Sequence, residues 1–395
     1  MKIAYFTDSL LFSIGGVSNS LLNLSTSISK NGHKITIFAP KSPTQASKKK
    51  LLKGIKIDFF PSIEAPWNPR LRIGPPLSPR ILTKIKRDDP DIIHFHTPFL
   101  IGASAVVLGK SLKKPIVGTF HTYFMQPEYL KAAGINIPVK PLTNFLWKYA
   151  AFFYNQCDVV IAPSESVRKD LKKNGVKKPI HTISNFINED QFKLLSIKQL
   201  LALRVKLKLS KKVILYVGRL SHEKSLDILL KSFAKVLKKI GDISLLIIGE
   251  GQIESELKSL TKALGIKDRV VFMGSVSQET LLSGGYFQLA DTFATASGSE
   301  TQGIALIEAM YFGLPLVGIS RKGTYDVIKN VGLLSRPKDT SGLAKNILRV
   351  LTDESLKKKL SKASRKSFTQ KYAAKKIVNQ FENLYKQLSK RSQIY

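Results

Sequence analysis

The sequence predicts an α/β protein that is built on parallel sheets and divided into two domains. Short apolar runs alternate with amphipathic stretches from one end of the chain to the other, the pattern of buried strands connected by helices. The chain has 395 residues, more than the ~250–300 at which a single core usually stops growing. The apolar runs also form two series, separated by a polar, Lys-rich stretch at 185–212.

The first series predicts six strands, and the second predicts five. In order, the expected strands are Ile3–Thr7, Lys34–Phe38, Ile92–His96, Ile116–Phe120, Val159–Ala162 and Ile180–Ser184, then Val213–Val217, Ser244–Ile248, Val270–Met273, Thr292–Ala294 and Leu316–Gly318. Aromatic and aliphatic residues recur at helical spacing from Phe368 to Leu388, which predicts a helix with one buried face. We therefore expect domains at 1–188 and 189–367, with a C-terminal helix in 368–395.

The net charge of +35 requires an explanation. It is spread along the chain, with +16 in residues 1–197 and +19 in the remainder, and no block of like charge is longer than three residues. Lys outnumbers Arg by 50 to 13, which favours diffuse attraction to an anionic surface over bidentate recognition of bases. An anionic membrane surface is the expected partner and nucleic acid is not, with a Lys-rich composition bias as the alternative.

Several classes of protein do not fit the sequence. No run approaches the ~20 apolar residues of a membrane span, and Asp8 interrupts the apolar N-terminus, which disfavours a secretory signal. The single cysteine, Cys157, excludes an internal disulfide and fits a reducing cytoplasm. We therefore expect a cytoplasmic protein, and nothing in the sequence requires more than a monomer.

Two motifs about eighty residues apart indicate a pocket for a sugar nucleotide. In Gly218-Arg-Leu-Ser-His-Glu-Lys224, a glycine lets the chain turn off an apolar strand, and Arg219 and Lys224 can converge on a diphosphate. In Glu300-Thr-Gln-Gly303-Ile-Ala-Leu-Ile-Glu308, two carboxylates flank a glycine at the start of an apolar helix, where free N–H groups attract phosphate. Cations suit the phosphates and carboxylates suit sugar hydroxyls, so no metal is expected.

Each of these residues also has a structural interpretation. Arg219 and Lys224 are alternatively an ordinary salt bridge and the start of a solvated helix, and Glu300 is alternatively a carboxylate favoured by a helix N-terminus. Glu308, inside the helix, can accept hydrogen bonds from a ribose diol. The turn Gly249-Glu250-Gly251 follows a strand, and it permits close backbone approach to the base, although a glycine after a strand is usually only a turn.

These motifs, GRLxxEK, IIGEG and SETQGIALIEAM, resemble those of family 4 of the retaining glycosyltransferases, over essentially the whole chain. The resemblance implies the GT-B fold: two Rossmann-like domains facing each other across a cleft, with a C-terminal helix returning to the first. It also implies an acceptor domain followed by a donor-nucleotide domain. The donor residues that it implies are Arg219 and Lys224 at the pyrophosphate, Glu308 at the ribose, and Glu300 with Thr301, Gln302, Gly303 and Ile304 at the sugar. The segment from Gly323 to Gly332 departs from the family pattern, where a longer loop is common.

The N-terminal half carries matching candidates. Gly15-Gly16-Val17 opens the first helix, where backbone can approach a phosphate, and the family's GGV loop lies beside the donor diphosphate. His121 matches a histidine that the family uses near the reacting centre, with a capping or core histidine as the alternative. His94 and His96 share one strand face without an apparent third metal ligand. We expect His94 to be structural, and we interpret Asp89-Pro-Asp91 as a turn into the strand.

Two stretches concern the acceptor. The Pro-rich segment 66–80 contains Arg70, Arg72 and Arg80, and the segment 123–154 mixes aromatics such as Tyr123 and Trp147 with Lys148 and other lysines. Basic residues beside interfacial aromatics are typical of an element that lies on a membrane, and a cleft-lining loop followed by a core helix is the alternative. RIGPPLSPR followed by DIIHFHTPFLIGASA resembles the branch of the family that glucosylates diacylglycerol.

The sequence thus predicts a retaining transfer of a hexose, with glucose from UDP-glucose favoured, to a membrane lipid such as 1,2-diacylglycerol at the cytoplasmic face. Alternatives within the enzyme class are mannosyl transfer to phosphatidylinositol and transfer to a polysaccharide precursor. A sugar-nucleotide epimerase shares the architecture but would carry acid/base carboxylates in the cleft. A nucleic-acid-binding protein would explain the charge, and it predicts a steep salt dependence of binding.

Overall fold

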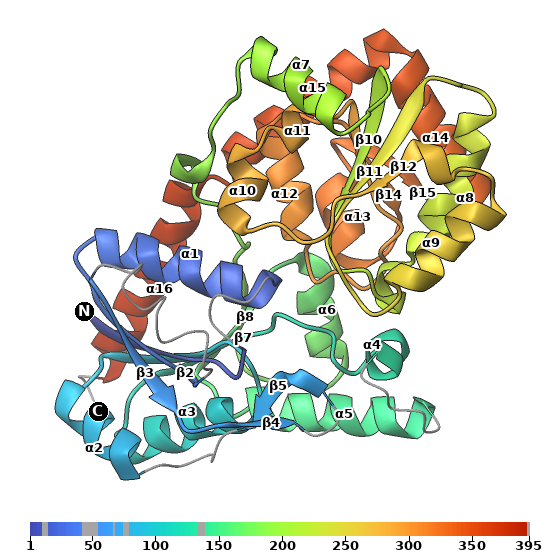
Figure 1. Cartoon of the computed structure of the whole chain (residues 1–395). Coiled ribbons are helices and arrows are strands. Elements are labelled where there is room, and N and C mark those ends of the chain that lie inside the picture. Colours follow the sequence, from blue (N-terminus) through green and yellow to red (C-terminus); the bar gives the residue numbers. More distant parts are fainter. Residues whose placement is uncertain (10–14, 42–53, 66–67, 74–78, 133–138, 393–395) are drawn as a thin grey trace. The chain divides into compact units, whose positions relative to one another are not determined.

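The computed structural model describes residues 1–9, 15–41, 54–65, 68–73, 79–132 and 139–392 (Figure 1). They form two compact units. The first contains Met1–Phe186 together with Ala374–Tyr395, and the second contains Ile187–Ala373. Among the described residues, no helix combines the length and the apolarity needed to cross a membrane.

The first unit is built on a parallel sheet of seven strands in the order β3-β2-β1-β6-β7-β8-β9. Its strands are β1 (Lys2–Phe6), β2 (Lys34–Pro40), β3 (Ile55–Phe60), β6 (Ile92–Phe95), β7 (Ile116–Thr119), β8 (Val159–Ala162) and β9 (Ile180–Thr182), and β4 (Ile63–Ala65) pairs antiparallel with β5 (Asn68–Ile73). Its helices are α1 (Gly16–Lys30), α2 (Pro79–Asp88), α3 (Leu100–Ser111), α4 (Pro127–Ala132), α5 (Val139–Tyr154), α6 (Glu165–Lys173) and α16 (Ala374–Ser392).

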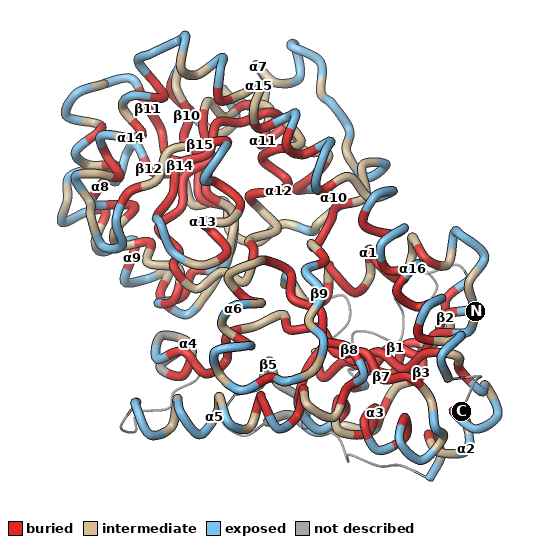
Figure 2. Tube along the Cα trace, turned by 180° about the vertical axis from the view of Figure 1, so that it is seen from behind, coloured by how far each residue is buried: buried red, intermediate tan, exposed pale blue. Residues whose placement is uncertain are grey.

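Helices cover both faces of this sheet, because successive side chains of a strand point to opposite faces. On one face, Ile3 and Tyr5 of β1 share an apolar cluster with residues of α1 and α16. On the other face, Ala4 and Phe6 share a cluster with residues of α2, α3 and α5. Strands covered on both faces are largely apolar, and Figure 2 shows the central strands β7 and β8 as buried.

The second unit is built on a parallel sheet of six strands in the order β12-β11-β10-β13-β14-β15. These strands are β10 (Lys212–Val217), β11 (Ile243–Ile248), β12 (Val270–Phe272), β13 (Thr292–Ala294), β14 (Leu316–Ile319) and β15 (Gly332–Ser335). The helices are α7 (Ile197–Lys206), α8 (Leu226–Leu237), α9 (Glu254–Ala263), α10 (Gln278–Ser283), α11 (Tyr286–Leu289), α12 (Ile304–Tyr311), α13 (Lys322–Ile328), α14 (Thr340–Thr352) and α15 (Glu354–Lys371).

In each sheet, the first strand of the unit lies inside the sheet, and the chain adds later strands first on one side of it and then on the other. From β10 the chain proceeds to β11 and β12 on one side and later to β13, β14 and β15 on the other. In open α/β sheets, ligands bind at the carboxyl ends of strands beside such a switch point. The fold therefore favours the ends of β10 and β13 in the second unit, and of β1 and β6 in the first.

The predicted fold class is confirmed, and each of the eleven expected strands is present. Two parallel strands were not expected, β3 and β15, and the presumed linker at 185–212 contains the helix α7. The contact-based boundary lies at 186/187, and the returning segment begins at Ala374, not at 368. Phe368 and Tyr372 belong to the core of the second unit, so the apolar spacing that predicted one helix in fact spans parts of two.

Candidate functional site

Close backbone approach fixes the turn after β10. Gly249 has φ 142°, and a Cβ at this position would lie 2.0 Å from the carbonyl oxygen of Gly218. The Gly218 N–H donates to Ile248 (3.0 Å), and the Leu220 N–H donates to the carbonyl of Glu250 (3.0 Å). These contacts join the ends of β10 and β11, so glycine is required for packing at Gly249, where sequence predicted access to the base.

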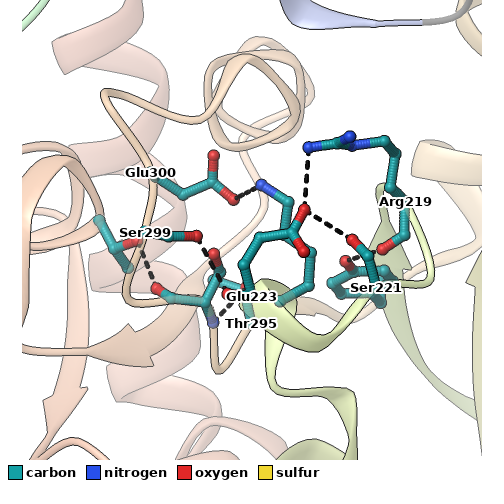
Figure 3. Close-up of polar contacts among 10 residues, drawn as sticks. Arg219, Ser221, Glu223, Thr295, Ser299 and Glu300 are labelled. Atoms are coloured by element: carbon teal, nitrogen blue, oxygen red, sulfur yellow. Dashed lines mark hydrogen bonds and ion pairs between the residues drawn. The ribbon is translucent and has the colours of Figure 1, made fainter. Parts of the chain in front are cut away.

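The first motif folds over a buried carboxylate that sequence reasoning did not single out. The Arg219 guanidinium donates to Glu223 (2.8 Å), and the Ser221 hydroxyl donates to the same oxygen (2.6 Å). Glu223 is buried, whereas half of the Arg219 side chain is exposed. Figure 3 shows Arg219 and Ser221 converging on Glu223. Glu223 thereby orients Arg219 at the carboxyl end of β10.

An ion pair connects the two motifs. Lys224 Nζ donates to Glu300 Oε1 at 2.6 Å, and both side chains are largely buried. Burial by itself raises the pKa of Glu300, but the charge of Lys224 and its hydrogen bond hold that pKa below the ordinary value. The Ser299 hydroxyl also donates to the Glu223 carbonyl (3.0 Å; Figure 3). Residues that are 76 positions apart in sequence thus form one charged cluster.

The loop before α12 is held by backbone contacts. Gly303, at the N-cap of α12, has φ 88°, a conformation that disfavours a side chain. The Gly323 N–H donates to the carbonyl of Glu300 (3.0 Å), and a Cβ on Gly323 would lie 2.4 Å from the carbonyl oxygen of Thr301. The first turn of α13 therefore packs directly on the 300–303 loop. The segment that departs from the family pattern is the one that supports this loop.

Glu308 lies buried on α12, and the Gln278 side chain donates to its Oε1 at 2.7 Å. Burial raises the pKa of Glu308 to about 7, and the hydrogen bond from Gln278 only partly opposes this. Sequence reasoning missed Gln278, since no local pattern marks the first residue of α10 as the partner of a residue on another helix.

The pKa of Glu308 predicts a pH dependence of stability. The pKa of about 7 in the folded state exceeds the ordinary glutamate value of 4.5, so between pH 4.5 and pH 7 the folded state holds a proton that the unfolded state releases. The contribution is fully present below about pH 4.5 and is lost as pH rises through about 7. In calorimetry of the protein without ligand, we expect the Tm of the transition that unfolds the second unit to fall between pH 5 and pH 8. We expect this fall to be smaller in Glu308→Gln. If calorimetry shows the same change of Tm with pH in Glu308→Gln and in the wild type, the raised pKa of Glu308 is wrong.

In the first unit, a buried aspartate organises the ends of β1 and β6. Asp8 accepts hydrogen bonds from the Thr97 hydroxyl (2.7 Å) and from the backbone N–H groups of Ile101 (2.7 Å) and Gly102 (3.3 Å). These N–H groups lie in the first turn of α3, where a carboxylate is stabilising. The role of Asp8 was not predicted from the sequence, where its partners lie about ninety residues away. Gly15 precedes α1 and Gly16 begins it.

Three histidines form a chain of contacts in the same unit. His94 contacts the Tyr385 hydroxyl through Nδ1 and the Thr119 hydroxyl through Nε2, both at 2.7 Å. His96 Nδ1 lies 2.9 Å from His121 Nε2. Burial lowers the pKa of His121 to about 4 and lowers that of the other two, so all three are neutral at pH 7. The chain runs from α16, which carries Tyr385, to the carboxyl end of β7.

Replacement of His94 is expected to destabilise the first unit. In His94→Leu the buried hydroxyls of Tyr385 and Thr119 lose a partner, at a cost of roughly 2–4 kcal/mol in the free energy of unfolding. Tyr385→Phe removes one partner only and is expected to cost about 1 kcal/mol. Denaturant unfolding followed by circular dichroism measures both. A His94→Leu protein as stable as the wild type would refute a structural role for His94.

The acceptor candidates are not all at the surface. Tyr123 is buried, and its hydroxyl donates to Asp170 (2.8 Å). Trp147 stacks on Phe120 with ring centroids 6.1 Å apart and packs against the core, so neither ring is an exposed membrane anchor. Lys148 is exposed, as are two other aromatics of α5, Phe145 and Phe152. The side chains of Arg70, Arg72 and Arg80 lie outside the described residues.

The predicted donor residues Arg219, Lys224, Gly249, Glu250, Glu300–Ile304 and Glu308 all lie in the second unit, and Gly15, Gly16, Val17 and His121 lie in the first. Within the second unit, the Lys224–Glu300 ion pair joins the two predicted motifs. The cations Arg219 and Lys224 lie at the carboxyl ends of strands beside the switch point, where open α/β sheets bind ligands, and such cations suit phosphate groups. Two parallel α/β units with this site are what the resemblance to the glycosyltransferases of GT-B fold predicted.

Comparison with known proteins identifies the family. The model of Glycosyltransferase Family 4 matches residues 14–191, and the model of Glycosyl transferases group 1 matches residues 202–367. The chain is 31% identical to an alpha-monoglucosyldiacylglycerol synthase of Streptococcus pneumoniae, over 80% of this chain and 70% of that protein. The chain belongs to glycosyltransferase family 4, as its motifs predicted, and it resembles the branch that contains this synthase.

Other similar proteins act on different sugars. The chain is 27% identical to the sulfoquinovosyl transferase SQD2 of Arabidopsis thaliana, over 94% of this chain and 70% of that protein. It is also 27% identical to a GDP-mannose-dependent alpha-mannosyltransferase of Corynebacterium glutamicum, over 83% and 74%. Among solved structures, HepE of Anabaena in complex with UDP-glucose has a TM-score of 0.79 at 18% identity, with 98% of this chain and 100% of that chain covered. These matches support the fold and the enzyme class without selecting the sugar.

Proposed function

We propose that this glycosyltransferase moves a hexose, with glucose from UDP-glucose favoured, to the hydroxyl of a membrane lipid such as 1,2-diacylglycerol, with retention of the anomeric configuration. The observation that carries the donor assignment is the cluster of Arg219, Lys224 and Glu300 at the carboxyl ends of β10 and β13. The lipid acceptor is supported by the similarity to the alpha-monoglucosyldiacylglycerol synthase. The enzyme would act as a peripheral protein on the cytoplasmic face of the membrane.

In this proposal the residues of the second unit divide the work at the donor. Arg219 and Lys224 bind the diphosphate and neutralise its growing negative charge as the bond to the sugar breaks. Glu308 accepts hydrogen bonds from the ribose diol. Glu300 orients the sugar together with the backbone of Thr301, Gln302 and Gly303, and Ile304 follows them at the start of α12. The acceptor hydroxyl attacks from the face on which the phosphate departs and transfers its proton to the departing phosphate oxygen, which gives retention.

The two proposed donor cations of the second unit, Arg219 and Lys224, each pair with a carboxylate. The ion pair between Lys224 and Glu300 satisfies both charges, and the Arg219 guanidinium rests on Glu223. A diphosphate that binds Lys224 competes with Glu300 for this cation, which frees the Glu300 carboxylate for a sugar hydroxyl. Such an exchange links diphosphate binding to the contact with the sugar. His121 and the turn at Gly15–Val17 stay predictions from the family resemblance.

Direct assay tests the proposal. The full chain is incubated with UDP-glucose, UDP-galactose or GDP-mannose and with vesicles that contain either diacylglycerol or phosphatidylinositol, and the extracted lipids are analysed by mass spectrometry and NMR. We expect glucosyldiacylglycerol with an α-linkage. A product only with GDP-mannose and phosphatidylinositol would favour the mannosyltransferase alternative, which the GDP-mannose-dependent relative supports. No lipid product with any donor would refute the acceptor assignment.

A further inference from the structure

One helix of the second unit exposes an apolar stripe. Ile197, Leu201 and Val205 follow one another at four-residue spacing along α7, and their exposed fractions are 78%, 58% and 78%. Residues four apart lie on one helix face, so the three side chains form a continuous row. The opposite face of α7, with Leu200 and Leu203, packs on the core. Folding of the second unit therefore holds α7 in place and leaves the stripe uncovered.

The neighbouring helix α15 is strongly basic. Figures 1 and 2 both show α7 beside α15. An open hollow of about 670 Å³ is lined by Leu194 and Leu200 from the α7 side and by Lys358, Lys362 and Arg365 from α15. The Arg365 guanidinium lies over the ring of Tyr311 in the same hollow, 4.4 Å from its centroid. Lys358, Lys362 and Arg365 are exposed. Leu194 and Leu200 thus line the hollow together with cationic side chains of α15, and the stripe occupies another face of the same helix α7.

The charge of this surface is mostly positive. Helix α7 contains three basic residues and no acidic residue, and α15 contains seven basic residues and one glutamate. The acidic residues that line the hollow are Asp291 and Glu354, and Asp291 is paired with Lys357. Monomeric proteins seldom expose a row of large aliphatic side chains unless something covers it. Aliphatic residues that insert below the headgroups, bordered by lysines that attract them, are the features that bind an anionic bilayer.

We propose that the surface formed by α7 and α15 is a docking site for anionic phospholipid on the donor-nucleotide unit. The aliphatic stripe of Ile197, Leu201 and Val205 enters the acyl boundary, and the lysines of α15 contact the phosphates. Phospholipid phosphate also fits the hollow where Arg365 lies over Tyr311. This inference deepens the proposed membrane association and rests on it, and it places a membrane contact in a part of the chain that the sequence indicated only as a linker.

The surface lies away from the donor motifs within the second unit. The hollow is lined by Asp291 and Pro315, which immediately precede β13 and β14, whereas Glu300 follows the carboxyl end of β13. The strands of a parallel sheet separate these two edges. Substitutions in the docking surface are therefore expected to leave UDP binding unchanged, and UDP affinity serves as the test that each variant has folded.

Vesicle binding of the full chain, without a sugar nucleotide, tests the proposal. Wild-type protein is expected to sediment with vesicles of phosphatidylcholine and phosphatidylglycerol and not with phosphatidylcholine alone. The triple variant Ile197→Ser, Leu201→Ser, Val205→Ser and the double variant Lys358→Glu, Lys362→Glu are each expected to lower the partition coefficient by about tenfold or more. The matched control Lys238→Glu, Lys239→Glu changes the net charge equally at the exposed end of α8, and it is expected to stay within about twofold of wild type.

Three outcomes overturn the docking site. The first is a wild-type protein that does not bind the anionic vesicles. The second is a loss of binding as large in the α8 control as in the α15 variant, which would show only the effect of total charge. The third is unchanged vesicle binding of the α7 variant together with a change from dimer to monomer in sedimentation velocity, which would assign the stripe to a second copy of the chain.

A further variant separates this surface from the predicted membrane element of the first unit. Phe145→Ser, Phe152→Ser removes the exposed aromatics of α5 and leaves α7 intact. We expect this variant still to bind anionic vesicles through the α7 stripe. Adding the triple substitution in α7 is therefore expected to lower vesicle binding further. If vesicles bind but no glycolipid forms with any donor, the proposed function fails while the docking site stands.

Discussion

Lys224→Ala is expected to reduce the rate of sugar transfer by about 10²–10³-fold, the usual loss when one preorganised group that stabilises developing charge is removed. Lys224 is the cation that contacts Glu300 at 2.6 Å, and in the proposed reaction it binds the departing diphosphate. Steady-state transfer with a saturating acceptor measures kcat, and titration with UDP and with inorganic pyrophosphate measures affinity. Both ligands are expected to bind more weakly, because both carry the diphosphate.

A control variant distinguishes two causes of a lower rate: loss of the positive charge that binds the leaving diphosphate, and loss of an ion pair in itself. Lys231→Ala breaks an exposed pair with Asp227, 3.3 Å apart on α8, and it is expected to leave transfer unchanged, since exposed pairs contribute little. The double variant Lys224→Ala, Glu300→Gln removes the unpaired carboxylate as well. If it regains the wild-type rate, Lys224 acts only by holding Glu300, and its role at the diphosphate is wrong.

Glu308→Gln is expected to weaken UDP binding by roughly 10–100-fold at pH 8 and to leave pyrophosphate binding unchanged. At pH 8 the carboxylate is largely ionised, because its pKa is about 7, and hydrogen bonds to a charged group contribute about 1.5–3 kcal/mol. Glutamine keeps the size of the side chain and loses the charge. Calorimetric titration with both ligands therefore distinguishes a contact with the nucleoside from a contact with the phosphates.

The matched control for this variant is Glu279→Gln, which makes the same change at an exposed position of α10. It is expected to bind UDP as the wild type does. Equal UDP affinities of Glu308→Gln and wild type at pH 8 would remove Glu308 from the ribose contact. A loss that extends equally to pyrophosphate would instead indicate that Glu308 supports the shape of the site and does not contact the nucleoside.

The donor motifs could be predicted because each is a local pattern. A glycine after an apolar strand and a carboxylate before an apolar helix are readable over a few residues, and parallel strands bring their carboxyl ends to one edge. The contact between Lys224 and Glu300 follows from that topology. Asp8, Glu223 and Gln278 were missed because their significance depends on partners or burial that the linear sequence does not show.

In the segment 123–154, the sequence suggested exposed residues that the fold partly buries. Its mixture of aromatic and basic residues predicted a membrane element, but composition does not indicate which side of a helix faces the core. Folding buries Tyr123, packs Trp147 against Phe120, and leaves Phe145 and Phe152 exposed. The same limitation concealed α7, where the sequence of partly buried and exposed leucines resembled weak patterning.

The sequence by itself determined the α/β class, the division into two domains, the family and the residues that we propose for the donor site, because strand periodicity and motif spacing are properties of short segments. Only the tertiary structure decided which carboxylates are buried, which cation pairs with which acid, and which apolar side chains stay exposed. Burial and pairing depend on what packs against a residue from distant parts of the chain, and these contacts set the pKa of Glu308, the ion pair of Lys224 and the uncovered stripe on α7.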